Sequence, residues 1–140
     1  MTLNWIGPIA AAATFFGIWV GHVSVRKIDF ISPTVWRPAA LALALGLGLE
    51  LWAYRTTNTG LAVALGILGM TVLWDAFEFA RQQRRIQRGH APANPNNPRH
   101  ARLLAAGGAT TVDLLKRAPV GRPVDPEQAL APAHPGEGSR

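Results

Sequence analysis

The chain has 140 residues, of which 49% are hydrophobic, and it carries a formal net charge of +6 at pH 7. It contains no cysteine, which excludes disulfides, thiolate nucleophiles and cysteine-bound metal or iron–sulfur sites. Acidic and basic side chains balance within residues 1–80, so the whole net charge belongs to residues 81–140. The composition therefore predicts an apolar first part and a basic second part.

Three apolar stretches dominate the first part of the chain. Residues 1–25 and 56–74 contain no Lys, Arg, Asp or Glu, and residues 39–49 consist of Ala, Leu and Gly. Such stretches match the roughly 20 apolar residues that cross a bilayer core of about 30 Å. A cleaved signal peptide is disfavoured because no basic residue precedes Arg26. A soluble core helix is disfavoured because it would usually carry a polar stripe.

We therefore expect an all-α integral membrane protein with three transmembrane helices, a cytoplasmic helical extension and a disordered Pro/Gly-rich tail. The three-helix membrane domain is expected at residues 1–88, with helices at about residues 3–25, 38–54 and 60–88.

Two signals mark the ends of the third helix. Asn58 and its neighbouring threonines can cap its start, and Gly89 is expected to end its extension. The prolines that follow, Pro92, Pro95 and Pro98, predict an extended linker. Residues 89–140 are therefore expected to form a basic flexible cytoplasmic tail, with short helical turns at most.

The distribution of basic residues predicts the orientation. The first loop carries Arg26, Lys27 and Arg37, and an arginine cluster follows the third helix, whereas the second loop carries Arg55 alone. The positive-inside rule then places the N-terminus outside and the C-terminus in the cytoplasm of a multi-pass inner (plasma) membrane protein. Glu50 and Arg55 are interpreted as an interfacial pair at the outer boundary.

Ionisable residues near the inner ends of the first and third helices are expected to meet. Both helices run inward in this topology, which brings His22, Arg26 and Lys27 to the level of Asp75 and Glu78. Two interpretations stay open. The cluster is either a structural clamp that holds the two helices together, or a proton-responsive site in which the titratable imidazole faces a carboxylate.

Four arginines follow the third apolar stretch directly: Arg81, Arg84, Arg85 and Arg88. Anionic lipid headgroups are their expected partners, because each basic residue near a charged membrane contributes about 1 kcal/mol of attraction. Nucleic acid is disfavoured because no aromatic side chains alternate with the arginines to stack on bases.

No motif of an active site is present. The sequence lacks phosphate-binding, zinc-protease and nucleophile-elbow motifs, so we expect no catalytic residues and no enzyme activity. His90, His100 and His134 stand apart from other metal-ligating residues in the sequence and are expected to be exposed to solvent. We therefore expect no metal and no cofactor.

Small residues predict close helix packing. Gly17 and Gly21 form a G-x-x-x-G pattern, and Ala62 and Gly66 have the same spacing. Such residues let two helix backbones approach in a membrane. The pattern fits contacts between helices of one chain as well as a homodimer.

Further residues carry a resemblance to a known family: Asn4, Trp5, Gly7, Thr14, Phe15, Gly21, His22, Leu68, Gly69, Leu73, Trp74, Glu78, Arg88, Gly89, Pro92, Asn94 and Pro95. In order and spacing the chain resembles the small prokaryotic membrane-protein family catalogued as domain of unknown function 4491, over roughly residues 4–99. Val23 and Phe30 mark departures, since the family pattern has a proline after His22 and more aromatic residues in the first loop. The resemblance implies a bacterial or archaeal inner-membrane protein and draws attention to His22, Trp74 and Glu78 without giving them a role.

Two functions stay open at this point. The preferred one is a small membrane protein that acts as an accessory or scaffold component and presents its basic tail to lipid or to a larger membrane complex. The alternative is a small oligomeric proton-linked transporter that uses His22, Asp75 and Glu78. A carrier needs a polar path at the middle of the membrane, and these acidic residues lie toward a boundary.

Overall fold

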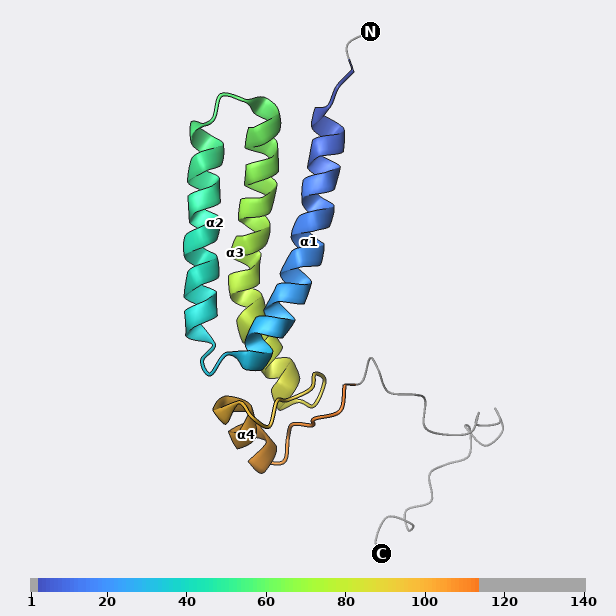
Figure 1. Cartoon of the computed structure of the whole chain (residues 1–140), viewed down its shortest axis with the longest axis vertical. Helices are drawn as coiled ribbons and strands as arrows, with labels where there is room; N and C mark the ends of the chain where they lie inside the picture. Colours follow the sequence, from blue (N-terminus) through green and yellow to red (C-terminus); the bar gives the residue numbers. More distant parts are fainter. Residues whose placement is uncertain (1–2, 114–140) are drawn as a thin grey trace, which may run out of the picture.

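The computed structural model describes residues 3–113, and residues 1–2 and 114–140 lie outside the described part (Figure 1). The described chain is helical, as the sequence predicts, and within it Pro92 and Thr110 form an isolated parallel bridge. The four helices are α1 (Ile6–Ile31), α2 (Trp36–Arg55), α3 (Thr59–Gln87) and α4 (Pro98–Ala105).

The three long helices form a bundle with α3 in the middle. Both α1 and α2 pack against α3, whose last turns extend beyond α2. The chain runs down α1, up α2 and down α3, so α1 and α3 are parallel and α2 is antiparallel to both (Figure 1). The short helix α4 lies below the bundle, beside the ends of α1 and α3.

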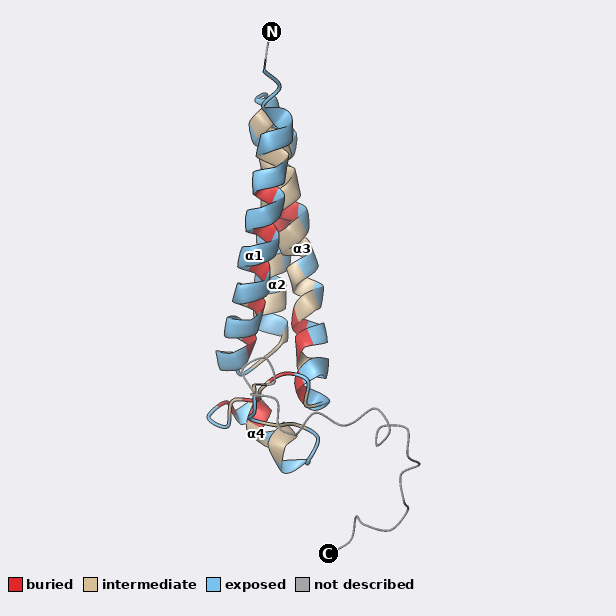
Figure 2. Ribbon diagram, turned by 90° about the vertical axis from the view of Figure 1, so that its right-hand side faces the viewer, coloured by how far each residue is buried: buried red, intermediate tan, exposed pale blue. Residues whose placement is uncertain are grey.

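One face of α1 is buried against α3. Its buried residues recur every four positions: Ala13, Gly17, Gly21, Val25 and Asp29 (Figure 2). A Cβ atom added at Gly17 would lie 3.0 Å from Oγ1 of Thr71, and one at Gly21 would lie 2.7 Å from Oδ2 of Asp75. The G-x-x-x-G pattern therefore packs against α3 of the same chain, because the missing side chains let Thr71 and Asp75 lie directly against the α1 backbone.

The opposite face of α3 packs on α2 by the same means. A Cβ atom at Gly46 would lie 2.6 Å from Cγ of Leu73 and 2.9 Å from its backbone nitrogen. A Cβ atom at Gly69 would lie 2.8 Å from Oε1 of Glu50, and one at Gly66 would lie 4.0 Å from Oε2. Glu50 is thus directed at α3, which differs from the expected interfacial pair with Arg55.

Large apolar side chains cover the outside of the bundle. Exposed ones include Phe15, Phe16, Trp19, Leu41, Leu45, Met70 and Phe77. Two helices of the described chain, α1 and α3, are long and apolar enough to cross a membrane. The sequence predicts three such helices, but α2 is not among them. Its charged residues, Arg37, Glu50 and Arg55, lower its mean hydropathy.

The helix boundaries follow local signals. Nothing in the sequence breaks α1 before Ser32 and Pro33, so it continues to Ile31 rather than ending near residue 25. Asn58 caps α3 as expected, and its side chain accepts a hydrogen bond of 3.0 Å from the backbone N–H of Leu61. The extension of α3 ends at Gln87, just before Gly89, whose φ is +71°. The amides of Gly89 and His90 donate to the carbonyls of Ile86 and Arg85, which is the Schellman arrangement of a helix end.

Residues 89–113 fold back on the bundle, and we call this segment the end cap. A small apolar core joins it to α3: Ile86 is 1% exposed and packs with Ala91 and Ala93, and Leu103, Leu104 and Ala109 surround them. The backbone N–H of Ala93 donates to the carbonyl of Thr110 at 2.7 Å. The expected flexible tail is therefore corrected over residues 89–113, while the rest of that prediction lies outside the described residues.

Candidate functional site

A buried ion pair joins the end of α1 to the end cap. Asp29, in the last turn of α1, is 1% exposed. Its Oδ1 lies 2.8 Å from Nη2 of Arg99, and the same nitrogen donates to the backbone carbonyl of Asp29 at 2.9 Å. Nη1 of Arg99 donates to Oε1 of Gln83 on α3 at 3.1 Å. One guanidinium thus connects α1, α3 and α4, and a charge-assisted bond of this length is among the stronger polar contacts in proteins.

Two asparagines bind the free carbonyls at the end of α1. The side-chain amide of Asn94 donates to the carbonyl of Phe30 at 3.0 Å. That of Asn97 donates to the carbonyls of Phe30 at 3.2 Å and Ser32 at 2.8 Å. The last carbonyls of a helix lack partners within the helix, so the end cap supplies the partners that α1 needs.

Asn97 also starts α4. Its Oδ1 accepts a hydrogen bond of 3.1 Å from the backbone N–H of Arg99, and Pro98 occupies the first helical position. Both features are typical of helix N-termini. Asn97 therefore caps the start of α4 and binds the carbonyls at the end of α1.

His100 is fully buried beside this ion pair. Its Nδ1 accepts a hydrogen bond of 3.0 Å from the backbone N–H of Asn94. The proton of the neutral ring then resides on Nε2, which lies 3.5 Å from Oδ2 of Asp29. Burial and the neighbouring Arg99 guanidinium lower the pKa of His100 from its usual value, and the Asp29 carboxylate offsets part of this effect. We call Asp29, Asn94, Asn97, Arg99 and His100 the polar latch.

The cluster predicted from the sequence has a different arrangement. Glu78 pairs with arginines of its own helix, Arg81 at 3.2 Å and Arg85 at 3.6 Å. Arg26 lies 4.0 Å from Asp113. The acidic groups of α3 are thus not joined to Arg26 or Lys27 by any ion pair among residues 3–113.

The rotation of α1 explains this difference. Gly21, Val25 and Asp29 form the face that meets α3, which leaves Arg26 and Lys27 on an exposed side of the helix. Asp75 therefore meets Gly21 of α1. His22 is exposed and lines a groove together with Asp75.

The four arginines after the third apolar stretch have two kinds of surroundings. Arg81 and Arg85 pair with Glu78, and Arg81 also lies over the ring of Trp74 at 5.9 Å. Arg84 and Arg88 are exposed on the last turns of α3. Their binding to headgroups stays a prediction.

The polar latch was not predicted from the sequence. His90 is exposed as expected, but the expected exposure of His100 is wrong, and His134 lies outside the described residues. One local signal was available: Asn97 followed by Pro98 is typical of a helix start. No local signal pairs Arg99 with Asp29, because the two residues lie 70 positions apart in the chain.

The fold and the latch define a helical bundle that is apolar on its outside and carries a small polar cap at one end. The chain belongs to the family described as Domain of unknown function (DUF4491), whose model matches residues 4–97. This confirms the resemblance seen in the sequence. No curated protein and no solved structure matches the chain.

Proposed function

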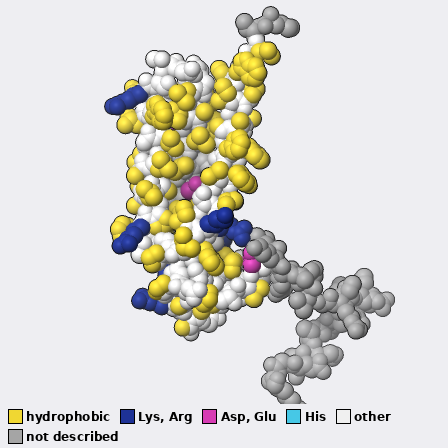
Figure 3. Space-filling model, viewed as in Figure 1, with side chains coloured by type: hydrophobic (Ala, Val, Ile, Leu, Met, Phe, Trp, Pro, Cys, Tyr) yellow, Lys and Arg dark blue, Asp and Glu magenta, His cyan; other side chains and the backbone are white. Residues whose placement is uncertain are grey.

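We propose that the protein is an integral membrane scaffold whose end cap lies in the cytoplasm. The observation that carries this proposal is the outer surface of the bundle, which is covered by large apolar side chains. Figure 3 shows hydrophobic side chains spread over the viewed face of the helices. Trp19 on α1, Leu41 on α2 and Phe77 on α3 are all exposed, although a soluble helical bundle would bury such side chains.

The connectivity supports three crossings, although α2 is less apolar than its neighbours. At about 1.5 Å per residue, α1, α2 and α3 span roughly 39, 30 and 44 Å, and a bilayer core measures about 30 Å. If α1 and α3 cross in the same direction, α2 has to return through the membrane between them. Its carboxylate at Glu50 faces Gly69 of α3, which keeps this charge away from lipid.

The basic residues support the orientation. Among residues 3–113, every Lys and Arg except Arg55 lies at the end where α1 and α3 finish, or beyond it in the end cap. The positive-inside rule places this end in the cytoplasm. The scaffold role is supported by the latch, since its buried polar groups are used to hold three helices together.

Alkaline extraction and cysteine labelling of the full chain in cells test the proposal. The native chain has no cysteine, so a single one can be placed at Thr57→Cys in the second loop or at Asn96→Cys in the end cap, both exposed positions. The protein should stay in the membrane pellet, and an impermeant maleimide should label residue 57 in intact cells and residue 96 only after lysis. Release by carbonate would contradict membrane insertion, and the opposite labelling would contradict the orientation.

Proton-linked transport is the second candidate, and one cavity favours it. A groove of about 620 Å³ between α1 and α3 is lined by His22, Thr71 and Asp75 together with apolar side chains. In liposomes that contain the purified protein, a pH gradient should then drive proton flux that Asp75→Asn abolishes. Flux equal to that of empty liposomes would contradict this role.

A further inference from the structure

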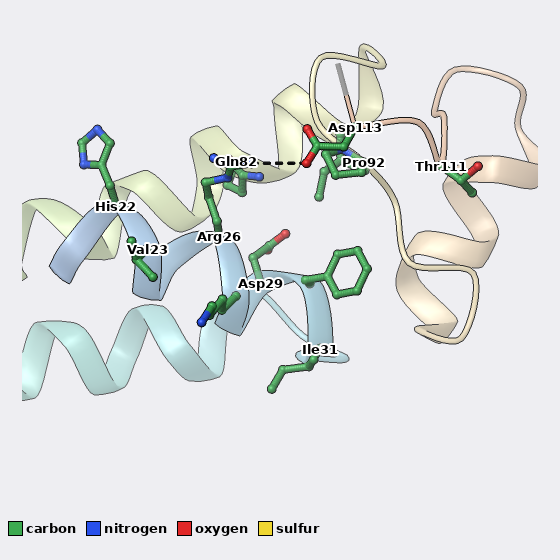
Figure 4. A pocket seen from close by; sticks show the side chains of 12 residues that line it. His22, Val23, Arg26, Asp29, Ile31, Gln82, Pro92, Thr111 and Asp113 are labelled. Atoms are coloured by element: carbon green, nitrogen blue, oxygen red, sulfur yellow. Dashed lines mark ion pairs between the residues drawn. The ribbon is translucent and has the colours of Figure 1, made fainter. Parts of the chain in front are cut away.

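A second cavity lies where the end cap meets the inner ends of α1 and α3 (Figure 4). Its volume is about 810 Å³, within the range of about 300–1,000 Å³ that is typical of sites for small molecules. The cavity lies outside the polar latch, although Asp29 forms part of its wall.

The walls combine two chemistries. Apolar side chains from α1 and α3 form one part of the lining: Val23, Phe30, Ile31 and Ile86. Two basic residues, Arg26 and Lys27, form another part, and both are exposed on α1. Asp29 contributes little repulsion to an anion, because its carboxylate is already paired with Arg99.

A carboxylate of the cavity wall, that of Asp113, lies near Arg26. In Figure 4 the side chains of Arg26 and Asp113 point toward each other, and Nη2 of Arg26 lies 4.0 Å from Oδ2 of Asp113. The pair is a weak one because the two atoms are 4.0 Å apart and the Arg26 side chain is 47% exposed, and pairs of this kind contribute on the order of 1 kcal/mol or less. Arg26 can therefore turn to a phosphate oxygen at small cost, and a guanidinium matches the geometry of a phosphate well.

The position of the cavity along α1 indicates that the anion is the headgroup of a lipid. On α1 it begins near His22, after the uncharged part of the helix, and it ends at Ile31, the last helical residue. In the membrane orientation proposed above, this is the level of the cytoplasmic headgroups. Basic pockets between helices on that side suit the headgroup of an anionic lipid, and the apolar walls suit its acyl chain.

We propose that this cavity binds one anionic phospholipid, with Arg26 and Lys27 at the phosphate and the apolar walls against the first part of an acyl chain. The proposal rests on the membrane location proposed above. It differs from the attraction of Arg84 and Arg88 to the membrane surface, because a cavity selects a single lipid and holds it.

Native mass spectrometry of the full chain tests this site. The protein is purified in detergent, mixed with phosphatidylglycerol or phosphatidylcholine of the same acyl chains, and the retained lipid is counted. One phosphatidylglycerol should be retained in preference to phosphatidylcholine. The double variant Arg26→Gln with Lys27→Gln should weaken its retention roughly 10- to 30-fold, as expected for the loss of two charges at the headgroup.

Arg37→Gln is the matched control. Arg37 is an exposed cation at the same end of the bundle, but it does not line the cavity. Retention by this variant should equal that of the native chain. Equal retention of the two lipids, or equal losses in Arg37→Gln and the double variant, would overturn the proposal.

A soluble competitor separates a lipid site from a phosphate site. Glycerol phosphate carries the same anion without an acyl chain, so it should displace the lipid poorly, and efficient displacement would overturn the proposal. These outcomes are distinct from failure of the membrane proposal, because carbonate extraction and cysteine labelling report insertion without any measurement of lipid selectivity.

Discussion

The helical bundle and the end cap are held together by different interactions. In the bundle, glycines bring helix backbones together, as where Gly21 meets Asp75 and Gly46 meets Leu73. In the end cap, a few buried polar side chains bind helix ends, and the apolar core around Ile86 is small. This difference fits the proposal that the bundle lies in lipid and the end cap in water. Close packing associates helices in lipid, whereas an exposed segment in water needs specific hydrogen bonds to hold one position.

Loss of the buried ion pair should have the largest effect. Asp29→Asn keeps the shape of the side chain but leaves the charge of Arg99, which is 12% exposed, without its partner. Removing one member of a buried pair typically costs about 3–5 kcal/mol, so the end cap should detach while the bundle stays folded. Trypsin cleavage at Arg102, a site that all the variants keep, measures this in the full chain, with faster cleavage expected.

The double variant Asp29→Asn with Arg99→Met is the control for that experiment. Removing both charges should cost less than removing one, because no uncompensated charge is then left buried. Equal cleavage rates in the native chain and Asp29→Asn would show that the latch does not hold the end cap.

A single methyl group added at Gly46 should destabilise the bundle. Gly46→Ala places its Cβ against the side chain and backbone of Leu73, and overpacking of this kind costs about 1–3 kcal/mol. Gly48→Ala is the matched control on the same helix, since nothing lies within 4 Å of its added Cβ. Thermal unfolding in detergent should show a lower midpoint for Gly46→Ala and an equal or higher one for Gly48→Ala. Equal shifts in both variants would contradict the α2–α3 packing described here.

Asn97→Ala should weaken the end cap by a smaller amount. It removes the bonds to the carbonyls of Phe30 and Ser32 together with the N-cap of α4, and caps of this kind contribute about 0.5–2 kcal/mol. Its neighbour Asn96 is exposed, so Asn96→Ala serves as the control. The same trypsin assay should show faster cleavage for Asn97→Ala alone, and identical rates in both variants would contradict the assigned bonds.

The smallest expected effect is a dependence on pH. The pKa of His100 is lowered in the docked end cap, so the detached state binds a proton more readily than the docked state does. The contribution of His100 to docking should therefore be largest above about pH 6.5 and decrease as the pH falls toward about 5. Protonation also conflicts with the amide of Asn94, because Nδ1 already accepts its hydrogen.

Trypsin cleavage across this pH range, corrected for the activity of the protease on an unfolded peptide, measures the effect. His100→Asn should remove the added sensitivity at low pH, whereas the native chain and a His90→Asn control should keep it. The same pH profile in all three proteins would show that His100 is not responsible.

The sequence predicted the parts of the bundle that depend on local patterns. The caps of α3 at Asn58 and Gly89 follow from residue type, and the glycine spacing of α1 predicted close packing. The rotation of α1 about its axis could not be predicted from the depth of its residues in the membrane alone. His22, Arg26 and Asp75 lie near the same level, but the side of α1 that meets α3 is decided by where glycine permits contact.

The end cap could not be predicted because its contacts are distant in the sequence. The prolines at residues 92, 95 and 98 predicted an extended linker, and residues 101–106 predicted at most a short helical turn. What orders the segment is a set of partners on α1, contributed by Asp29 and by the carbonyls of Phe30 and Ser32. Backbone carbonyls at a helix end carry no signature in the sequence.

Hydrogen–deuterium exchange of the full chain in lipid nanodiscs tests most directly whether the end cap is a folded part of the protein. The amides of Ala93 and Asn94 are the ones to follow, since they donate to the carbonyl of Thr110 and to Nδ1 of His100. Both should exchange far more slowly than the same sequence in a free peptide. Exchange at the rate of the free peptide would contradict the docked end cap and the latch that holds it.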